Sequence, residues 1–295
     1  MMQEKTKNSV ADFDWAFLLF LICITNVKLY IKVFAVLFYC LYIVHKNYKL
    51  GKLQDISKFY FILPIIGTVG ALLHDSFSAP GYWFGYLFGV LNWVIAGIAA
   101  CFLYVAVQNV PKHKLLATIK MFFLLNTIVS LGELGRMIVQ SGQLVPYWYW
   151  EPTEYYGGST GDHILGITGN ISVTNATICS IGTLFFLFYE EVKWSLMCIL
   201  VLLLCTSNMT LIMTTATLLG LFIIINKKRF RIHTLFVLLT IVCVYPILSF
   251  NNIKYVDRVY DDEVEYSEKL EKKKIKPNIL KNIGNENAKS NFTFN

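Results

Sequence analysis

Apolar stretches long enough to cross a lipid bilayer recur through most of this chain, and they limit what it can fold into. The clearest one covers residues 83–107 and carries no formal charge. A helix of about 20 apolar residues is enough to span the hydrocarbon core. The composition agrees, since 56% of all residues are hydrophobic and 15% are charged, whereas soluble domains carry about 25% charged residues. We therefore expect an all-α, polytopic integral membrane protein built as a helical bundle.

The basic residues divide the connections between these stretches into two classes. We expect about nine transmembrane helices, at residues 13–27, 30–44, 59–73, 83–107, 115–131, 167–189, 194–204, 211–225 and 234–250. The first two form a tight pair, because the apolar run that contains them is too long for one span and short for two, so this pair either crosses the membrane or enters it only in part. Lysine and arginine gather in the connections 45–58, 111–114 and 227–231, and this number of spans places all three on one side. Because basic loops are retained in the cytoplasm, we predict a cytoplasmic N-terminus.

The opposite side is predicted to carry two long polar segments. An external loop at residues 132–165 contains four acidic residues and one arginine, which are Glu133, Arg136, Glu151, Glu154 and Asp162. The multi-span membrane domain then extends to residue 250, and residues 251–295 form a charged external tail. One interpretation makes this tail the start of a large external loop, and the other makes it a natural disordered C-terminus.

Composition argues against several other classes of protein. The net charge of +7 does not indicate nucleic-acid binding, because the basic residues flank apolar runs, as the positive-inside rule requires. All seven cysteines lie within apolar stretches and lack the spacing of a metal site, so we interpret them as small buried side chains. We expect no metal and no cofactor, and find neither a nucleotide-binding motif nor a catalytic triad.

Glu133 and Arg136 are the first candidates for a substrate site. They lie three residues apart where a span is expected to meet the outer surface, so they share one helix face. In one interpretation they form an interfacial ion pair that contributes little. In the other, Arg136 faces a cavity and binds an anionic group, since a guanidinium matches the geometry of phosphate oxygens.

The external loop supplies the remaining candidates. His163, which follows Asp162 in a glycine-rich stretch, has the side chain best suited to act as a base near neutral pH, although a surface histidine without a role is the alternative. Trp148 and Trp150 belong to an aromatic cluster at 147–150. Such a cluster is typical of an interfacial aromatic belt, and the competing hypothesis is a platform on which sugar rings stack.

Two segments carry a resemblance to a known family. Residues 164–177, ILGITGNISVTNAT, open a span after an external loop that bears an arginine, and residues 202–220, LLLCTSNMTLIMTTATLLG, follow as a span pair joined by a turn. This arrangement resembles the O-antigen polymerase/ligase family of integral membrane proteins (Wzy-like) over about residues 136–250. Asn208 stands where that family often has arginine, Val173 and Thr174 replace its proline-containing segment, and the family continues with further spans, so the resemblance implies a C-terminally truncated or decayed copy.

The resemblance implies a glycosyltransferase-like reaction at the outer face of a bacterial inner membrane. The donor would be an oligosaccharide linked to polyprenyl pyrophosphate, and repeat units would be joined into O-antigen of lipopolysaccharide or into capsular polysaccharide. Arg136 and Arg258 would bind the pyrophosphate. His163 is the candidate for the catalytic base, although ligases of this family place theirs in the large loop and no histidine of this chain follows His233. The alternatives are a flippase that transports lipid-linked glycan and an inactive membrane component of a polysaccharide assembly system.

Overall fold

The computed structural model describes residues 13–26, 28–49, 54–73, 81–141, 148–149, 158–169 and 171–247, and almost all of them are helical. The helices are α1 (Trp15–Thr25), α2 (Leu29–His45), α3 (Gln54–Leu73), α4 (Tyr82–Asn109), α5 (Lys112–Ser141), α6 (Ser172–Phe188), α7 (Val192–Leu204), α8 (Asn208–Ile224) and a last helix, Lys228–Ile247. The remaining elements are the short strands β1 (Trp148–Tyr149) and β2 (Gly158–Ser159) and the 3-10 helices η2 (Thr160–His163) and η3 (Gly166–Thr168). The predicted all-helical architecture is confirmed.

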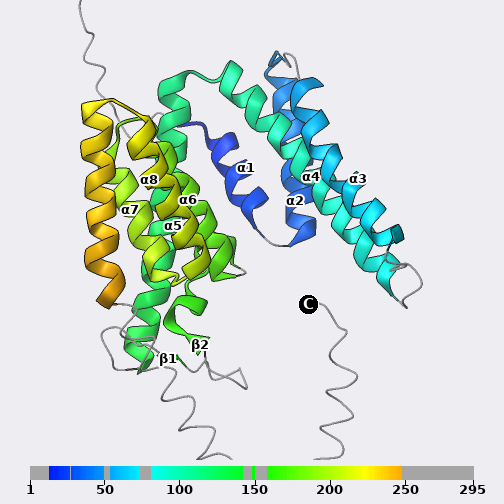
Figure 1. The fold of residues 1–295 in the computed structure, drawn as a ribbon. Helices are drawn as coiled ribbons and strands as arrows, with labels where there is room; N and C mark the ends of the chain where they lie inside the picture. The colour runs from blue at the N-terminus through cyan, green and yellow to red at the C-terminus, as the bar shows by residue number, and fades with distance from the viewer. Residues whose placement is uncertain are drawn as a thin grey trace, which may run out of the picture.

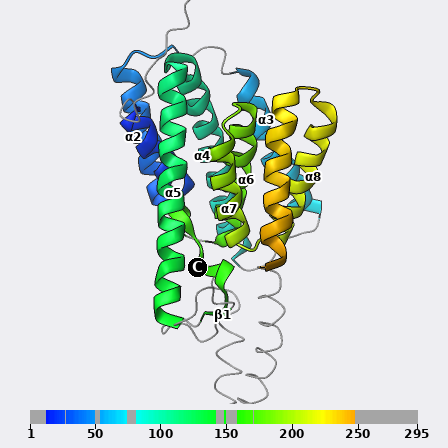
Figure 2. The same ribbon diagram turned by 90° about the vertical axis from the view of Figure 1, so that its left-hand side faces the viewer.

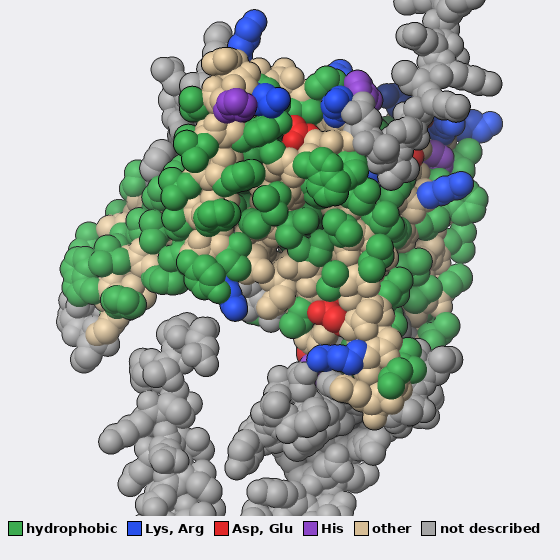
Figure 3. Space-filling model, turned by 180° about the vertical axis from the view of Figure 1, so that it is seen from behind, with side chains coloured by type: hydrophobic (Ala, Val, Ile, Leu, Met, Phe, Trp, Pro, Cys, Tyr) green, Lys and Arg blue, Asp and Glu red, His purple; other side chains and the backbone are tan. Residues whose placement is uncertain are grey.

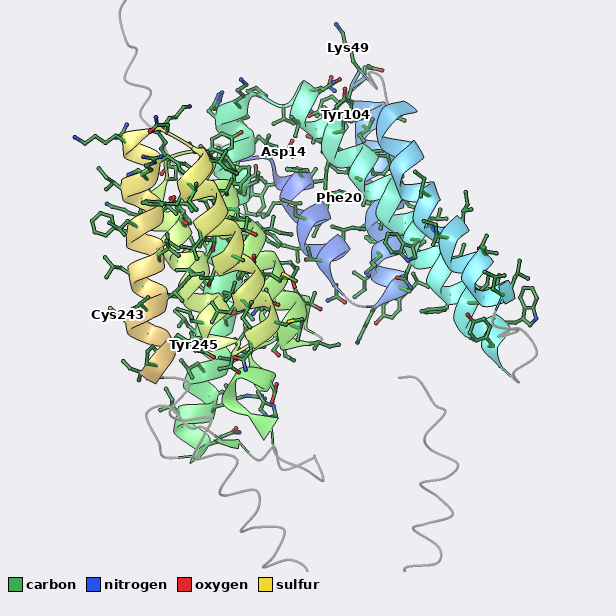
Figure 4. All side chains as sticks on the ribbon, in the orientation of Figure 1. Asp14, Phe20, Lys49, Tyr104, Cys243 and Tyr245 are labelled. Carbon is green, nitrogen blue, oxygen red and sulfur yellow. The ribbon has the colours of Figure 1, made fainter. Side chains whose placement is uncertain are left out.

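The described helices run alternately up and down, so their ends form two opposite surfaces (Figure 1). One surface, which we call the basic end, carries Lys49 (Figure 4) and the connections at 110–112 and 225–227. The other, which we call the loop end, carries the α1–α2 turn, the α7–α8 turn and the segment 158–169. The helices α4, α5 and Lys228–Ile247 are long and apolar enough to cross a membrane, and the other described apolar helices are shorter.

Helix α5 and helix α6 differ from the expected spans. Helix α5 ends at Ser141 rather than near residue 131, so Gly132, Glu133 and Arg136 belong to the helix and not to an external loop. Single glycines are tolerated inside a helix at a cost of about 1 kcal/mol, and the first proline beyond them is Pro146. Helix α6 begins at Ser172 rather than at residue 167, because η3 occupies the preceding residues.

Two hydrophobic clusters hold the helices together, and the short helix α1 lies between them. The larger cluster joins α5, α6, α7, α8 and Lys228–Ile247, with Leu18 of α1 at its margin. The smaller cluster packs Phe17 and Phe20 of α1 against Tyr39 of α2 and Val105 of α4. Helix α3 contacts α4, and in Figure 1 this pair extends away from the bundle as an arm. Helix α1 therefore couples the arm to the bundle.

Much of the outer surface of the described helices is apolar. Green hydrophobic side chains cover the middle of the molecule in Figure 3, whereas basic side chains gather along the upper, basic end. On the arm, Phe84 is 78% exposed and Leu73 is 79% exposed. A contiguous apolar surface of this extent is not stable in water, and it indicates a membrane protein whose helices contact lipid.

Asp14 fixes the start of α1 at the side of the basic end. Its Oδ1 accepts a hydrogen bond from the backbone N–H of Phe17 at 3.0 Å, which caps the helix. Its own backbone N–H donates to Oγ1 of Thr118 on α5 at 2.9 Å. The Tyr42 hydroxyl on α2 donates to Oδ2 of Asp14 at 3.4 Å. One carboxylate thus ties α1 to α2, and its backbone ties α1 to α5.

Replacing Asp14 with Ala is expected to destabilise the protein, because the cap and the bond from Tyr42 are both lost. Removal of a helix cap costs about 1 kcal/mol of stability. The unfolding temperature of the detergent-solubilised protein should therefore be lower in Asp14→Ala than in the wild type. Asp14→Asn is the matched control, since its side-chain oxygen still caps the helix. Equal unfolding temperatures for Asp14→Ala and the wild type would contradict this role.

Candidate functional site

The candidate site lies at the loop end, where residues 158–169 connect β2 to the start of α6. This segment contains η2 and η3, and both contact α5 and α6, while η3 also contacts α1. The segment begins at a two-residue antiparallel pairing in which Trp148 lies opposite Ser159. A non-helical chain inside an apolar bundle must find partners for its backbone polar groups. The neighbouring side chains show how these groups are satisfied.

Helix α5 presents a stripe of polar side chains to this segment. Asn126, Ser130 and Glu133 are spaced four and three residues apart, which places them on one face of the helix. Asn126 and Ser130 are fully buried, and Met137 continues the same buried face. A stripe of this kind costs free energy in an apolar bundle unless each group is paired.

Asn126 and Asn175 form the centre of the network. Nδ2 of Asn126 donates to Oδ1 of Asn175 at 2.8 Å and to Sγ of Cys179 at 3.3 Å. Nδ2 of Asn175 donates to Oγ of Ser130 at 3.1 Å and to the backbone carbonyl of Ile164 at 3.2 Å. All four amide N–H donors of the two side chains therefore have acceptors, so this buried network is saturated on its donor side.

The same side chains also bind the backbone of η3. Oδ1 of Asn126 accepts the backbone N–H of Ile167 at 2.9 Å, and Oε2 of Glu133 accepts the backbone N–H of Gly166 at 2.9 Å. The thiol of Cys205, in the α7–α8 turn, donates to the carbonyl of Ile164 at 3.5 Å. Helices α5, α6 and the α7–α8 turn thus all hold the segment from different sides.

Glycine at position 166 is required by this geometry. Its φ of +58° lies in the left-handed region, where other residues are strained. A Cβ at this position would overlap Oδ1 of Asn126 and would lie 2.7 Å from Nδ2 of Asn175. The absence of a side chain lets Gly166 lie against the two asparagines, so that Asn126 can bond Ile167 of η3 and Asn175 can bond Ile164 just before it.

The structure places the predicted substrate residues Glu133 and Arg136 on neighbouring positions of α5. The Glu133 side chain is half-buried and accepts a backbone hydrogen bond from η3, so its role in the structure is to position that segment. Arg136 is exposed, and its positive charge acts on the Glu133 carboxylate. The arginine is thus presented at the surface of the loop end beside an anchored, non-helical segment.

His163 is the last residue of η2 and is half-buried. Because η2 contacts α5, the histidine and Arg136 belong to packed elements at the same end of the molecule. Trp148 lies in β1, but its side chain falls outside the described part of the structure, as do Trp150 and Arg258 altogether. The structure therefore brings together the elements of Glu133, Arg136 and His163 and does not describe the other three candidates.

Sequence reasoning missed the two buried asparagines, although a signal was present. The spacing of Asn126, Ser130 and Glu133 marks a polar stripe on a single face of an otherwise apolar span. Asn175 lies within the 164–177 segment singled out above. Its pairing with Asn126, 49 positions away, depends on how the two helices pack.

Chemically, this end of the molecule offers a guanidinium and an imidazole beside a rigidly bonded backbone segment. Among the described residues, no group of three His, Cys, Asp or Glu side chains is placed to bind a metal ion. Searches with family models, among curated proteins and among solved structures give no match to the chain.

Gly166→Ala is expected to destabilise the protein more than Gly169→Ala. Both positions have a left-handed backbone, at φ +58° and +61°, but a Cβ at Gly169 meets no atom within 4 Å. Each substitution costs about 1–2 kcal/mol of backbone strain, and Gly166→Ala adds about 1–3 kcal/mol of overlap. Thermal unfolding in detergent measures the difference, and equal losses would show that the contact with the asparagines is unimportant.

Asn175→Leu is expected to lower the stability by about 1–3 kcal/mol, because a donor of Asn126 and the carbonyl of Ile164 lose a buried partner. The matched control is Thr177→Leu, on the exposed face of the same helix, which should unfold at the wild-type temperature. Limited proteolysis between residues 158 and 171 provides a second measurement, and should be faster in Asn175→Leu alone. Protection equal to that of the wild type would contradict the role assigned to the network.

Proposed function

We propose that this chain is an O-antigen or capsular polysaccharide polymerase-like membrane protein. It joins repeat units carried on polyprenyl pyrophosphate, and the site is the loop end of the bundle. The observation that carries this proposal is the exposed guanidinium of Arg136 beside the anchored segment that holds His163. The resemblance of residues 164–177 and 202–220 to O-antigen polymerases supports the same assignment.

The chemistry of the proposed reaction matches these two groups. Transfer of a glycan from a pyrophosphate requires a cation that stabilises the leaving group and a base that accepts the proton of the attacking hydroxyl. Arg136 supplies the fixed positive charge, and its planar fork suits phosphate oxygens. His163 is the proposed base, because neutral imidazole accepts a proton near pH 7. Glu133 is the positioning residue that holds η3 against α5.

The proposed setting is a bacterial inner membrane that holds a bundle of about nine helices, of which the short α1 does not cross the whole hydrocarbon core. The described part of the chain contains nine apolar helices of alternating direction, which is compatible with this count. The gathering of lysine and arginine at the basic end supports a cytoplasmic basic end and N-terminus. In this orientation the loop end faces the periplasm, where lipid-linked repeat units are joined.

A flippase for lipid-linked glycan is the second candidate, and one observation favours it. Transporters bind substrates at interrupted helices, and irregular backbone within a bundle commonly borders a binding site. The η3 segment, which precedes α6 and is held by Asn126 and Asn175, is such an interruption. Loss of a polymerase leaves single repeats at the cell surface, whereas loss of a flippase leaves no surface glycan. An inactivating substitution at the site therefore distinguishes the two functions.

Arg136→Ala in cells that depend on this gene is expected to reduce surface glycan from long polymers to single repeats, since the leaving pyrophosphate loses its cation. Gel electrophoresis of the extracted glycan measures the length. Arg136→Lys should retain part of the activity, and Lys193→Ala, an exposed cation at the basic end, should retain all of it. Unchanged polymer length would remove Arg136 from the site, and complete loss of surface glycan would indicate a flippase.

A further inference from the structure

Two lysines at the loop end lie outside the site described above. Lys28 immediately precedes α2, and Lys32 lies one helical turn further along it. A spacing of four residues places both on one face of the helix. Ala35 and Tyr39 continue this face and are buried against the neighbouring helices. Lys28 is exposed and Lys32 is half-buried. The inward-packing face of α2 therefore carries two positive charges at its N-terminal end.

The α1–α2 turn holds these lysines within the depth of the bundle. Helix α1 has 11 residues, which corresponds to about 16 Å, whereas the hydrocarbon core is about 30 Å thick. Figures 1 and 2 both place the lower ends of α1 and α2 above the lower end of α5. In Figure 3 the lower side of the molecule is hollowed between the arm and the bundle, and a basic side chain lies at the edge of the hollow.

Neither lysine has an acidic partner within the part of the chain that the structure describes. Among the described residues, neither ammonium group takes part in an ion pair or a hydrogen bond. The described carboxylates of the loop end belong to Glu133, which binds η3, and to Asp162 of η2. An uncompensated cation within membrane depth costs free energy, and two of them at the end opposite the basic end run against the usual distribution of lysine.

An anion that enters from the loop end would remove this cost. Ammonium groups bind phosphate oxygens through short, charge-assisted hydrogen bonds. A ligand that reaches a recess open to lipid must itself be amphiphilic, because the recess lies beside the apolar surface of the arm. A phosphate-bearing lipid head group has both properties.

We propose that Lys28 and Lys32 form a binding site for the phosphate of a lipid head group beneath the α1–α2 turn. Two sources provide this chemistry, which are the polyprenyl pyrophosphate carrier and an ordinary anionic phospholipid. The first source rests on the proposed function and would make the lysine pair the site where the carrier docks. The second does not depend on that function.

The test measures lipid binding by the full chain in nanodiscs of neutral lipid. Polyprenyl pyrophosphate, phosphatidylglycerol and inorganic pyrophosphate are titrated separately, and bound lipid is detected by native mass spectrometry. The variants are K28Q/K32Q, the charge-conserving K28R/K32R, and K227Q/K228Q, which removes two exposed lysines at the basic end. Far-ultraviolet circular dichroism and gel filtration confirm that each variant is folded.

The K28Q/K32Q substitution is expected to weaken binding of polyprenyl pyrophosphate, phosphatidylglycerol or both by about tenfold or more, while K28R/K32R and K227Q/K228Q bind as the wild type does. Selective loss of polyprenyl pyrophosphate identifies the carrier as the ligand, and an equal loss of both identifies lipid phosphate in general. Equal losses in K28Q/K32Q and K227Q/K228Q, or no loss in either, would overturn the proposal. Competition by inorganic pyrophosphate as strong as that by the lipid would overturn the assignment to a lipid.

These outcomes are independent of the polymer assay. Normal glycan length in Arg136→Ala, combined with lysine-dependent lipid binding, would remove Arg136 from the proposed polymerase site and leave the lipid site standing. The opposite result is shortened glycan in Arg136→Ala together with wild-type lipid affinity in K28Q/K32Q. This result would refute the lipid site alone.

Discussion

The hydrogen bonds between Asn126 and Asn175 are the interaction on which the loop end depends. An apolar bundle offers no water to an interrupted chain, so the backbone between β2 and α6 must bond to protein groups. The paired amides satisfy each other and also bind the Ile164 carbonyl and the Ile167 N–H. The Glu133 carboxylate accepts a further hydrogen bond, from the backbone N–H of Gly166. The polar stripe of α5 therefore holds this irregular segment in a fixed position. Because η2 is part of the same segment, its position is fixed as well.

Helix α1 is the second constraint, because it is short and belongs to both hydrophobic clusters. Leu18 faces the bundle, while Phe17 and Phe20 face the arm. Asp14 anchors its first turn to α2 and α5. A helix of this length cannot cross the hydrocarbon core, so its far end must turn back inside the bundle. The recess beneath this turn is therefore a consequence of where α1 begins and how few residues it contains.

The order and direction of the helices could be predicted from the sequence, but the boundaries at the site could not. Long apolar runs such as 83–107 locate a helix by composition alone, and α4 agrees closely with that prediction. Helix α5 was predicted to end near residue 131, with Glu133 and Arg136 at the outer surface, and it extends to Ser141 instead. Glu133 in this extension accepts a hydrogen bond from Gly166 of η3, and a contact between positions 133 and 166 leaves no periodic signal in the sequence. The candidates Glu133, Arg136 and His163 were visible as polar residues, whereas the pairing of Asn126 with Asn175 becomes evident only from the packing of α5 on α6.

The distribution of charge at the loop end links the two proposed sites. The Glu133 carboxylate accepts a hydrogen bond from the backbone of η3 and interacts electrostatically with Arg136 on the same helix. Arg136 on α5 and the Lys28–Lys32 pair on α2 belong to helices on either side of α1, and α1 contacts α2, α5 and η3. In the proposed reaction the carrier of the acceptor repeat unit would be held by the lysines near the arm, while the attacking hydroxyl of its glycan extends toward Arg136 and His163, where the donor's pyrophosphate leaves. In that arrangement α1 separates the place where the lipid is held from the place where the bond is made, and the anchoring of α1 by Asp14 sets the distance between them.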